Sequence, residues 1–410
     1  MALLSVEQAR ERILSQLHPS KTEILELAEC ANRVLAQDIA ATTDLPLFDH
    51  SSMDGFAVRS VDVAGAIDAS PRRLRVVADI PAGVSPKIFI APGQAARIMT
   101  GAQIPGGADA VVPVEETDFD IRDAGSPAPG QVQIFKAAKP GANIRTRGMD
   151  MKTGEFVLEK GHRLKPQDLG LLAMLGTAKV EVYRKPRIAL LSSGDELVGV
   201  DDPLEPCKIR DSNSYMLAAL IESAHAEAIQ LGVANDTRAS VEALFGRAVE
   251  QNADMILSSA GVSVGAFDFI REVVQSNGRM DFWLVNMRPG KPLAFGEYQN
   301  IPFVGLPGNP VSAFVGFEVF VRDELGRLGG LLNGGRQTVR VRIGEEIESD
   351  GRESYLRAVV HERNGILAAR LTGHQGSGNL RSLVQANALL IIPAGVKCVP
   401  AGKEVNAWLL

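Results

Sequence analysis

The chain has three cysteines among its 410 residues, and they are widely separated. Cys30, Cys207 and Cys398 form no CxxC or CxxH pattern. A disulfide framework is therefore excluded, and the ligand spacing that a structural zinc site requires is missing from the sequence. We interpret the three thiols as inert side chains of a protein that works in a reducing compartment.

Aromatic residues are also scarce, at 5% of the chain. The formal net charge is −6, and the basic residues are dispersed rather than gathered into one stripe. Surfaces that bind nucleic acid combine a positive groove with stacking side chains, so we expect no nucleic-acid partner. A local basic pocket for a small anion remains compatible with this composition.

Long hydrophobic runs are missing as well. No stretch approaches the roughly 18 uncharged apolar residues that a membrane helix needs. Glu7, Arg10, Glu11 and Arg12 interrupt the apolar pattern of the N-terminus, where the core of a signal peptide would be uncharged. We therefore expect a cytoplasmic protein with no membrane partner.

Several motifs of common enzymes are not found. The sequence has no GxxxxGK[ST] motif and no GxGxxG after an expected strand, which argues against ordinary ATPases and dinucleotide-binding enzymes. The six histidines show no metal-ligand spacing, and no Ser–His–Asp or Cys–His arrangement is apparent.

Length alone predicts two to four domains. The chain begins with a capping box, in which Ser5 precedes the helix and Gln8 stands three residues later. We predict a second helix over residues 23–34 and, from Asp38 onward, short strands separated by turns rich in proline and glycine. These expected strands cover residues 73–78, 88–90, 110–114 and 131–136.

A different pattern begins near residue 184. Apolar strands and helices alternate up to about residue 330, which indicates a mostly parallel sheet covered on both faces. The expected strands cover residues 187–191, 228–232, 255–258, 282–285 and 302–306, and the expected helices cover 215–225, 240–251, 267–277 and 311–325. After a glycine-rich linker, five further short strands predict a small barrel or sandwich.

Ligands of such sheets bind beyond the carboxyl ends of the strands. Four expected strand ends each supply carboxylates or glycine and serine: residues 192–196, 235–236, 259–265 and 305–310. Glycines let backbone N–H groups approach phosphate oxygens, while carboxylates without neighbouring His or Cys suit Mg²⁺. A single loop of this kind is often only a turn, and a single acidic residue is often a helix cap. Together the four loops predict a site for a phosphate ester and magnesium.

Arg288 and Lys291 lie on either side of a Pro-Gly turn. They are either the tip of a solvated hairpin or a clamp for phosphate or another oxyanion, and the residues alone favour neither interpretation.

The run Ser51 to Val58 resembles the SAMDGYAV segment of molybdopterin molybdenumtransferases, the family of bacterial MoeA and the E domain of gephyrin. Further segments resemble signatures of this family in the same order along the chain. They cover residues 97–102, 107–112, 143–150, 192–197, 210–213, 259–265, 287–292 and 305–310. An ordered series of this kind is far more specific than any one segment, and it covers essentially the whole chain.

The resemblance implies a homodimer whose subunit has four domains. A helical domain I (residues 1–37 and 140–183) would be interrupted by a β-rich domain II (38–139) and followed by an α/β domain III (184–329) and a β-barrel domain IV (330–410). The implied reaction inserts molybdate into adenylated molybdopterin and releases AMP with the help of Mg²⁺. The enzyme that supplies the substrate, an adenylyltransferase, would be a partner.

The resemblance also assigns roles to individual residues. Glu196 and Asp268 would bind the metal. Catalytic roles would fall to Asp54, Thr100, Glu196, Asp236 and Asp268, with Asp54 and Thr100 contributed across the dimer. Substrate would be bound by Arg145, Asp150, Ser193, Gly194, Ser259, Gly261, Ser263, Gly265, Arg288, Lys291, Pro307, Gly308, Asn309, Pro310 and Ser377.

Three positions depart from the family pattern. Ser193 replaces a usual Thr, Arg288 stands where some relatives have Lys, and Ala260 replaces the first Gly of a usual SGG. The Cβ of Ala260 is expected to restrict φ at that loop. No change removes a charge, so we expect activity to be retained.

Three alternatives stay open at this point. A molybdopterin adenylyltransferase resembles domain III alone, a gephyrin-like scaffold would bind partners instead of catalysing, and a related enzyme could use tungstate. The domains preceding residue 184 argue against the first, and the lack of an appended domain or long linker argues against the second. Tungstate and molybdate have nearly the same size and charge, so the sequence does not distinguish them.

Overall fold

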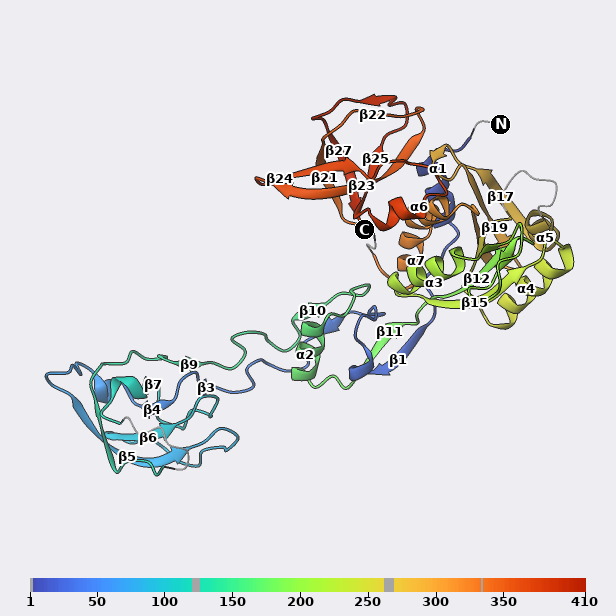
Figure 1. Cartoon of the computed structure of the whole chain (residues 1–410). Coiled ribbons are helices and arrows are strands. Elements are labelled where there is room, and N and C mark those ends of the chain that lie inside the picture. Colours follow the sequence, from blue (N-terminus) through green and yellow to red (C-terminus); the bar gives the residue numbers. More distant parts are fainter. Residues whose placement is uncertain (1–2, 120–125, 262–268, 333–334) are drawn as a thin grey trace. The chain divides into compact units, whose positions relative to one another are not determined.

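The computed structural model describes residues 3–119, 126–261, 269–332 and 335–410. The chain forms two compact units (Figure 1). Unit 1 comprises residues 1–37, 160–170 and 178–410, and unit 2 comprises residues 38–159 and 171–177. The expectation of a multi-domain, mixed α/β protein is therefore confirmed.

The centre of unit 1 is a six-stranded sheet in the order β15-β12-β16-β20-β19-β17. The first four strands are parallel, and the last two add antiparallel pairs at one side. These strands are β12 (Arg187–Ser193), β15 (Glu227–Ala234), β16 (Met255–Ser259), β17 (Gly278–Leu284), β19 (Pro292–Tyr298) and β20 (Ile301–Leu306). The mostly parallel sheet is as predicted, but β19 was not expected.

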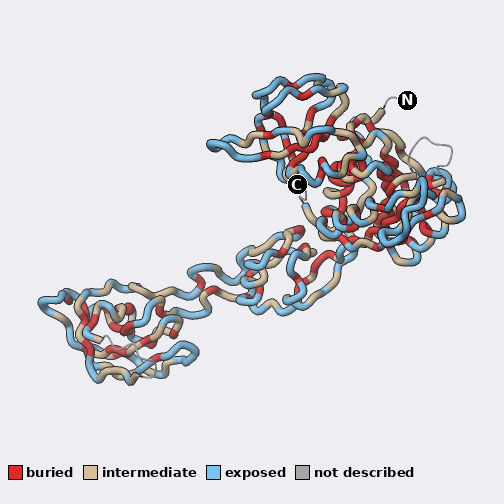
Figure 2. Tube along the Cα trace, viewed as in Figure 1, coloured by how far each residue is buried: buried red, intermediate tan, exposed pale blue. Residues whose placement is uncertain are grey.

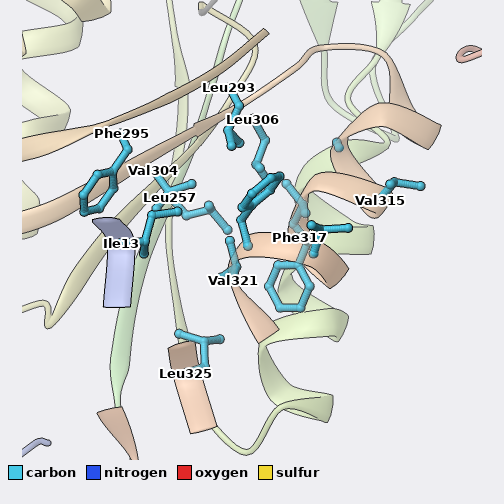
Figure 3. Packing of buried hydrophobic residues seen from close by; sticks show 14 of the residues in the cluster. Ile13, Leu257, Leu293, Phe295, Val304, Leu306, Val315, Phe317, Val321 and Leu325 are labelled. Carbon is cyan, nitrogen blue, oxygen red and sulfur yellow. The ribbon is translucent and has the colours of Figure 1, made fainter. Parts of the chain in front are cut away.

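Helices cover both faces of this sheet. Along β12, Ile188 and Leu190 face one buried cluster, while Ala189 and Leu191 face another. The first cluster includes residues of α1 (Val6–Leu14), α3 (Asn213–Ser223), α6 (Pro310–Phe320) and α7 (Arg322–Leu328) (Figure 3). The second includes α4 (Arg238–Glu250) and α5 (Phe269–Asn277). The central strands β12, β16 and β20 are buried on both faces, which explains why their sequences are continuous apolar runs (Figure 2).

The C-terminal strands of unit 1 close into a five-stranded barrel, because β23 pairs with both β24 and β25 and the ring continues through β21 and β27. The strands are β21 (Thr338–Ile343), β23 (Glu353–Arg363), β24 (Ile366–Leu371), β25 (Ala388–Ile392) and β27 (Glu404–Leu409). Leu356 and Leu390 fill the barrel, while Tyr355 and Leu389 face outward into the core of the α/β sheet. Successive side chains of β23 and β25 point to opposite faces, so that one set packs inside the barrel and the other packs against the α/β sheet.

Short elements complete this part of unit 1. They are β13 (Leu197–Val198), β14 (Ile209–Arg210), β18 (Met287–Arg288), β22 (Ile347–Glu348), β26 (Cys398–Val399) and helix α8 (Leu380–Val384). The single helix that we expected over residues 311–325 is divided into α6 and α7 at Val321.

The N-terminal segment differs most from its prediction. The capping box of Ser5 and Gln8 forms as predicted. The helix over residues 23–34 is wrong: β1 (Thr22–Glu26) pairs antiparallel with β11 (Lys179–Tyr183), and only a 3-10 turn, Leu27–Glu29, follows. Glu, Leu and Ala favour helix, but that preference is weak compared with pairing to a strand far along the chain.

Unit 2 is built around a five-stranded sheet in the order β7-β4-β6-β5-β8. Its strands are β4 (Gly55–Val58), β5 (Arg72–Ile80), β6 (Gln94–Ile98), β7 (Ala110–Pro113) and β8 (Gln131–Ile134). Two strand pairs extend from it: β3 (His50–Ser51) with β9 (Ile144–Arg145), and β2 (Ile39–Ala40) with β10 (Phe156–Leu158). Residues 88–90 form no strand and make only an isolated bridge at Phe89. Helix α2 (Pro166–Met174) has residues in both units.

Within the described residues, every helix is too short or too polar to cross a membrane.

Candidate functional site

A cavity of 560 Å³ lies at the carboxyl ends of the parallel strands of unit 1. It is lined by residues that follow β12, β15, β16 and β20, together with the start of α3 and of α6. Ten residues that the sequence singled out meet here: Ser193, Gly194, Glu196, Asp236, Ser259, Gly261, Pro307, Gly308, Asn309 and Pro310. The tertiary structure thus brings four separate loops to one place, as expected for an open α/β sheet.

Two carboxylates and a hydroxyl shape one wall of the cavity. Ser193 Oγ donates a hydrogen bond to Asp236 Oδ1 at 3.1 Å, which joins the ends of β12 and β15. Gly194 has φ of 148°, and a Cβ at this position would come within 2.5 Å of a carboxylate oxygen of Glu196. The absence of a side chain at residue 194 therefore lets the Glu196 carboxylate fold back over the loop.

The loop after β16 forms the floor. Ala260 has φ of 69°, in the left-handed region, and its backbone N–H donates to the Leu306 carbonyl at 3.0 Å. We expected the Cβ of Ala260 to restrict φ, and the structure places this residue in a left-handed conformation that is energetically unfavourable for alanine. Gly308 lies opposite, where an added Cβ would be 3.2 Å from the Ala260 Cβ. The methyl group of Ala260 therefore packs against the loop that leads into α6.

Asn213 is a site residue that was not predicted from the sequence, although it lies in the family-like segment 210–213. Asn213 is 7% exposed, and its Nδ2 donates hydrogen bonds to Ser259 Oγ at 2.8 Å and to the Gly308 carbonyl at 2.7 Å. Its Oδ1 is buried without a partner in the described structure. Neighbouring Arg210 and Asp211 also line the cavity. A polar residue at the start of a helix was the available signal, but the same pattern marks an ordinary helix cap.

A buried cation, Arg357, lies in β23 of the barrel. Arg357 is fully buried, and its guanidinium donates to Ser382 Oγ at 3.1 Å and to the Gly376 carbonyl at 2.9 Å. Its Nη1 has no partner among the described residues. Burial, and then the charge of Arg288, lower the pKa of Arg357 to about 10. The charge of Arg288 therefore acts on the buried guanidinium of Arg357, while Arg288 itself is 41% exposed and forms an ion pair with Asp350.

The loop that accepts hydrogen bonds from Arg357 also contacts the first turn of α6. The Ser377 carbonyl accepts a hydrogen bond from the Val311 N–H at 3.0 Å, in the first turn of α6. Arg288 lies in β18, which pairs with β23, and is 3.9 Å from Asp350. Lys291 is exposed on the turn between β18 and β19. Arg288, Lys291 and Ser377 do not line the 560 Å³ cavity itself.

The remaining described candidates lie in unit 2. The Thr100 N–H and hydroxyl both donate to Asp54 Oδ1, each at 2.7 Å. Arg145 forms an ion pair with Asp150. Ser263, Gly265 and Asp268 lie outside the described residues.

The described residues contain no group of three or more His, Cys, Asp or Glu side chains placed to share one metal ion. Mg²⁺ binds proteins through only one or two carboxylates, the rest of its ligands being waters and phosphate oxygens. Glu196 and Asp236, both on the cavity wall, are hard oxygen donors of this kind. The donors that are present therefore fit magnesium bound together with a phosphorylated substrate.

Three protein-family descriptions match the chain. The MoeA N-terminal region (domain I and II) covers residues 4–176, the probable molybdopterin binding domain covers 189–327, and the MoeA C-terminal region (domain IV) covers 340–410. The cavity lies within the second of these.

Relatives that align with nearly the whole chain point to the same family. A molybdopterin molybdenumtransferase of Nostoc is 40% identical over 94% of this chain and 88% of its own length. One of Haemophilus influenzae is 37% identical over 98% of both chains. The crystal structure of a molybdopterin biosynthesis MoeA protein from Pyrococcus horikoshii superposes with a TM-score of 0.83, at 31% identity and full coverage of both chains. The chain therefore belongs to the molybdopterin molybdenumtransferase (MoeA) family.

Proposed function

We propose that this chain acts in molybdenum cofactor biosynthesis and inserts the molybdenum of molybdate into adenylated molybdopterin, with release of AMP. The observation that carries the proposal is the cavity at the strand ends, together with the buried, partly unpartnered Arg357, whose loop is hydrogen-bonded to the first turn of α6. The cavity suits a large phosphorylated ligand, and the buried cation suits a compact oxyanion. Tungstate would fit the same chemistry.

The residues of the cavity position the substrate. The loops at Gly194, Gly261 and Gly308 would let backbone N–H groups approach phosphate oxygens, and the start of α6 adds its dipole. Glu196 and Asp236 would hold Mg²⁺, with Asp268 assigned to the same role by the family pattern. The bound ion would neutralise charge on the phosphoanhydride, and placing the reactants together would supply most of the remaining catalysis.

Arg288, Lys291 and Arg357 would attract and orient the oxyanion. Arginine binds through a planar fork and lysine through a point charge, so the two residue types make different contributions to one site. Ser377 would contribute through the loop that contacts α6. The buried position of Arg357 keeps its geometry constant, which is what a site that must present molybdate to a second ligand requires.

The chain would work as a homodimer in which the Asp54–Thr100 pair and the Arg145–Asp150 pair of one subunit serve the cavity of the other. The four domains would keep the boundaries at residues 37/38, 139/140, 183/184 and 329/330. An adenylyltransferase would deliver the adenylated pterin.

The test measures AMP release from adenylated molybdopterin with purified chain and Mg²⁺, with molybdate, tungstate or neither oxyanion. We expect release that depends on oxyanion, and a reduction of at least about tenfold in Glu196→Gln and in Lys291→Ala. Glu205→Gln, an exposed residue of the loop between β13 and β14, is the charge control and should keep the wild-type rate. Wild-type rates in both site variants would refute these assignments, and no release with either oxyanion would refute the transferase itself.

A further inference from the structure

A second, small cavity lies in unit 1 at the junction of three segments: the strand pair β1–β11, the turn between α3 and β15, and the turn after α7. Its volume is 20 Å³, enough for one particle slightly larger than a water molecule. Its polar lining includes Arg33, Arg163, Arg184, Lys185 and His225, and no carboxylate lines it within the described residues. We call it the junction cavity.

Arg163 is a partly buried cation of this cavity with no counter-charge among the described residues. Its Nε is buried without a hydrogen-bond partner, and within the described part of the chain its guanidinium has no ion pair. Burial lowers the pKa of Arg163, and no carboxylate opposes that effect. A partly buried guanidinium without a counter-charge is unfavourable, and proteins normally place a carboxylate beside it.

The surrounding charges deepen the positive potential. Arg33 and Arg184 are neutralised, because they form ion pairs with Glu23 and Asp254. Lys185 and His225 have no such partner among the described residues. The pKa of His225 is lowered by burial and then by the charges of Arg163, Lys185 and Arg322, of which Arg322 is paired with Glu318.

Helix ends do not account for Arg163 and Lys185. The C-termini of α3 and α7 both reach the junction cavity, and cations are favourable near such ends. However, the last carbonyls of α7 are already capped: Gly329, Gly330 and Leu331 N–H groups donate to Leu325, Arg327 and Gly326, and Ser20 N–H donates to Leu328. The turn after α3 is closed in the same way by the N–H groups of Ala224, His225 and Ala226. The carbonyls therefore do not require a hydrogen bond from Arg163.

We propose that the junction cavity binds one small inorganic anion, held between Arg163, Lys185 and His225. The anion would supply the counter-charge that the chain omits and would join the β1–β11 pair to the turns after α3 and α7. The volume favours a monatomic ion such as chloride, while a phosphate ion would enter with one oxygen. The site is separate from the 560 Å³ cavity, with which it shares no lining residue.

The first experiment measures thermal unfolding of the full chain in sodium chloride, sodium phosphate or sodium gluconate at equal ionic strength. Gluconate is too large for the cavity and serves as the reference. We expect chloride to raise the unfolding midpoint of the wild type by about 2–4 °C over gluconate. A larger gain in phosphate would identify an oxyanion as the occupant.

Arg163→Gln should abolish this gain. In gluconate the same variant should unfold at or above the wild-type midpoint, because it removes an uncompensated charge. Arg238→Gln, which removes an exposed cation of α4, should keep the anion-dependent gain. A gain in Arg163→Gln equal to that of the wild type would refute the proposal, as would the lack of a gain with both small anions.

A second measurement does not depend on any variant. Crystals of the wild-type chain soaked in sodium bromide should show an anomalous peak in the junction cavity, within contact distance of the Arg163 guanidinium. Ordered bromide elsewhere with none in this cavity would overturn the assignment.

Discussion

Asn213 Nδ2 donates a hydrogen bond to Ser259 Oγ at 2.8 Å and so ties the start of α3 to the end of β16. The same Nδ2 also donates to the Gly308 carbonyl, on the loop before α6. One buried amide thus holds together two of the loops that form the cavity.

Asn213→Ala should therefore loosen the cavity. We expect the free energy of unfolding to fall by about 1–3 kcal/mol, because a buried hydroxyl and a carbonyl lose their donor. We also expect a lower rate of oxyanion-dependent AMP release. Asn406→Ala, at an exposed position of β27, is the control and should change stability by less than about 0.5 kcal/mol. Urea unfolding of both variants measures the difference, and equal stability would contradict it.

Ala260→Gly should relieve backbone strain. Alanine in the left-handed region costs about 1–2 kcal/mol, and the greater freedom of glycine in the unfolded chain offsets part of that. We expect the unfolding free energy to stay constant or to rise by about 1 kcal/mol. Ala243→Gly, at an exposed position within α4, should instead lower it by about 0.5–1 kcal/mol. A similar loss in both variants would show that residue 260 is not strained.

Glu318 is a buried carboxylate shared by two arginines. Arg322 and Arg336 donate to its two oxygens at 2.7 to 2.9 Å. Burial raises the pKa of Glu318, but the hydrogen bonds from Arg336 and Arg322 outweigh this and leave the pKa below its ordinary value. Glu318→Gln should cost about 3–5 kcal/mol, because two partly buried cations lose their counter-charge.

The matched control for Glu318 is Glu242→Gln. Glu242 pairs with Arg238 one turn apart on α4, and both side chains are exposed. An exposed pair contributes about 0–1 kcal/mol, so the two variants should differ clearly in chemical denaturation. The loss in Glu318→Gln should also shrink at acidic pH, because a carboxylate with a lowered pKa stabilises the fold only while it is ionised.

The pKa of Glu324 is raised, in contrast to the lowered pKa of Glu318. Glu324 is fully buried, its oxygens have no partner in the described structure, and burial raises its pKa to about 8. The folded protein favours the protonated carboxyl group. Protonated Glu324 therefore contributes its full stability below pH 4.5, and this contribution is lost as the pH rises toward 8. Glu324→Gln removes this dependence. The variant should gain roughly 3–5 kcal/mol relative to the wild type between pH 4.5 and 8, and parallel stability–pH curves would disprove it.

The sequence by itself determined the family, the alternation of strands and helices over the central domain, and the loops that would meet at the cavity. Each of these depends on residues that are close together in the sequence. Apolar runs bounded by glycine and proline define β12, β16 and β20, and parallel strands necessarily bring their following loops to one edge. The capping box at Ser5 is local in the same sense.

Tertiary structure decided what depends on distant partners. Residues 22–26 form a strand because β11, more than 150 residues later, pairs with them and outweighs their helix preference. The unpartnered oxygen of Asn213 and the buried nitrogens of Arg163 and Arg357 become visible only when packing excludes every other partner. Burial and long-range contacts are properties of the folded chain. The local sequence around these three residues therefore does not predict that their polar atoms are buried without a partner.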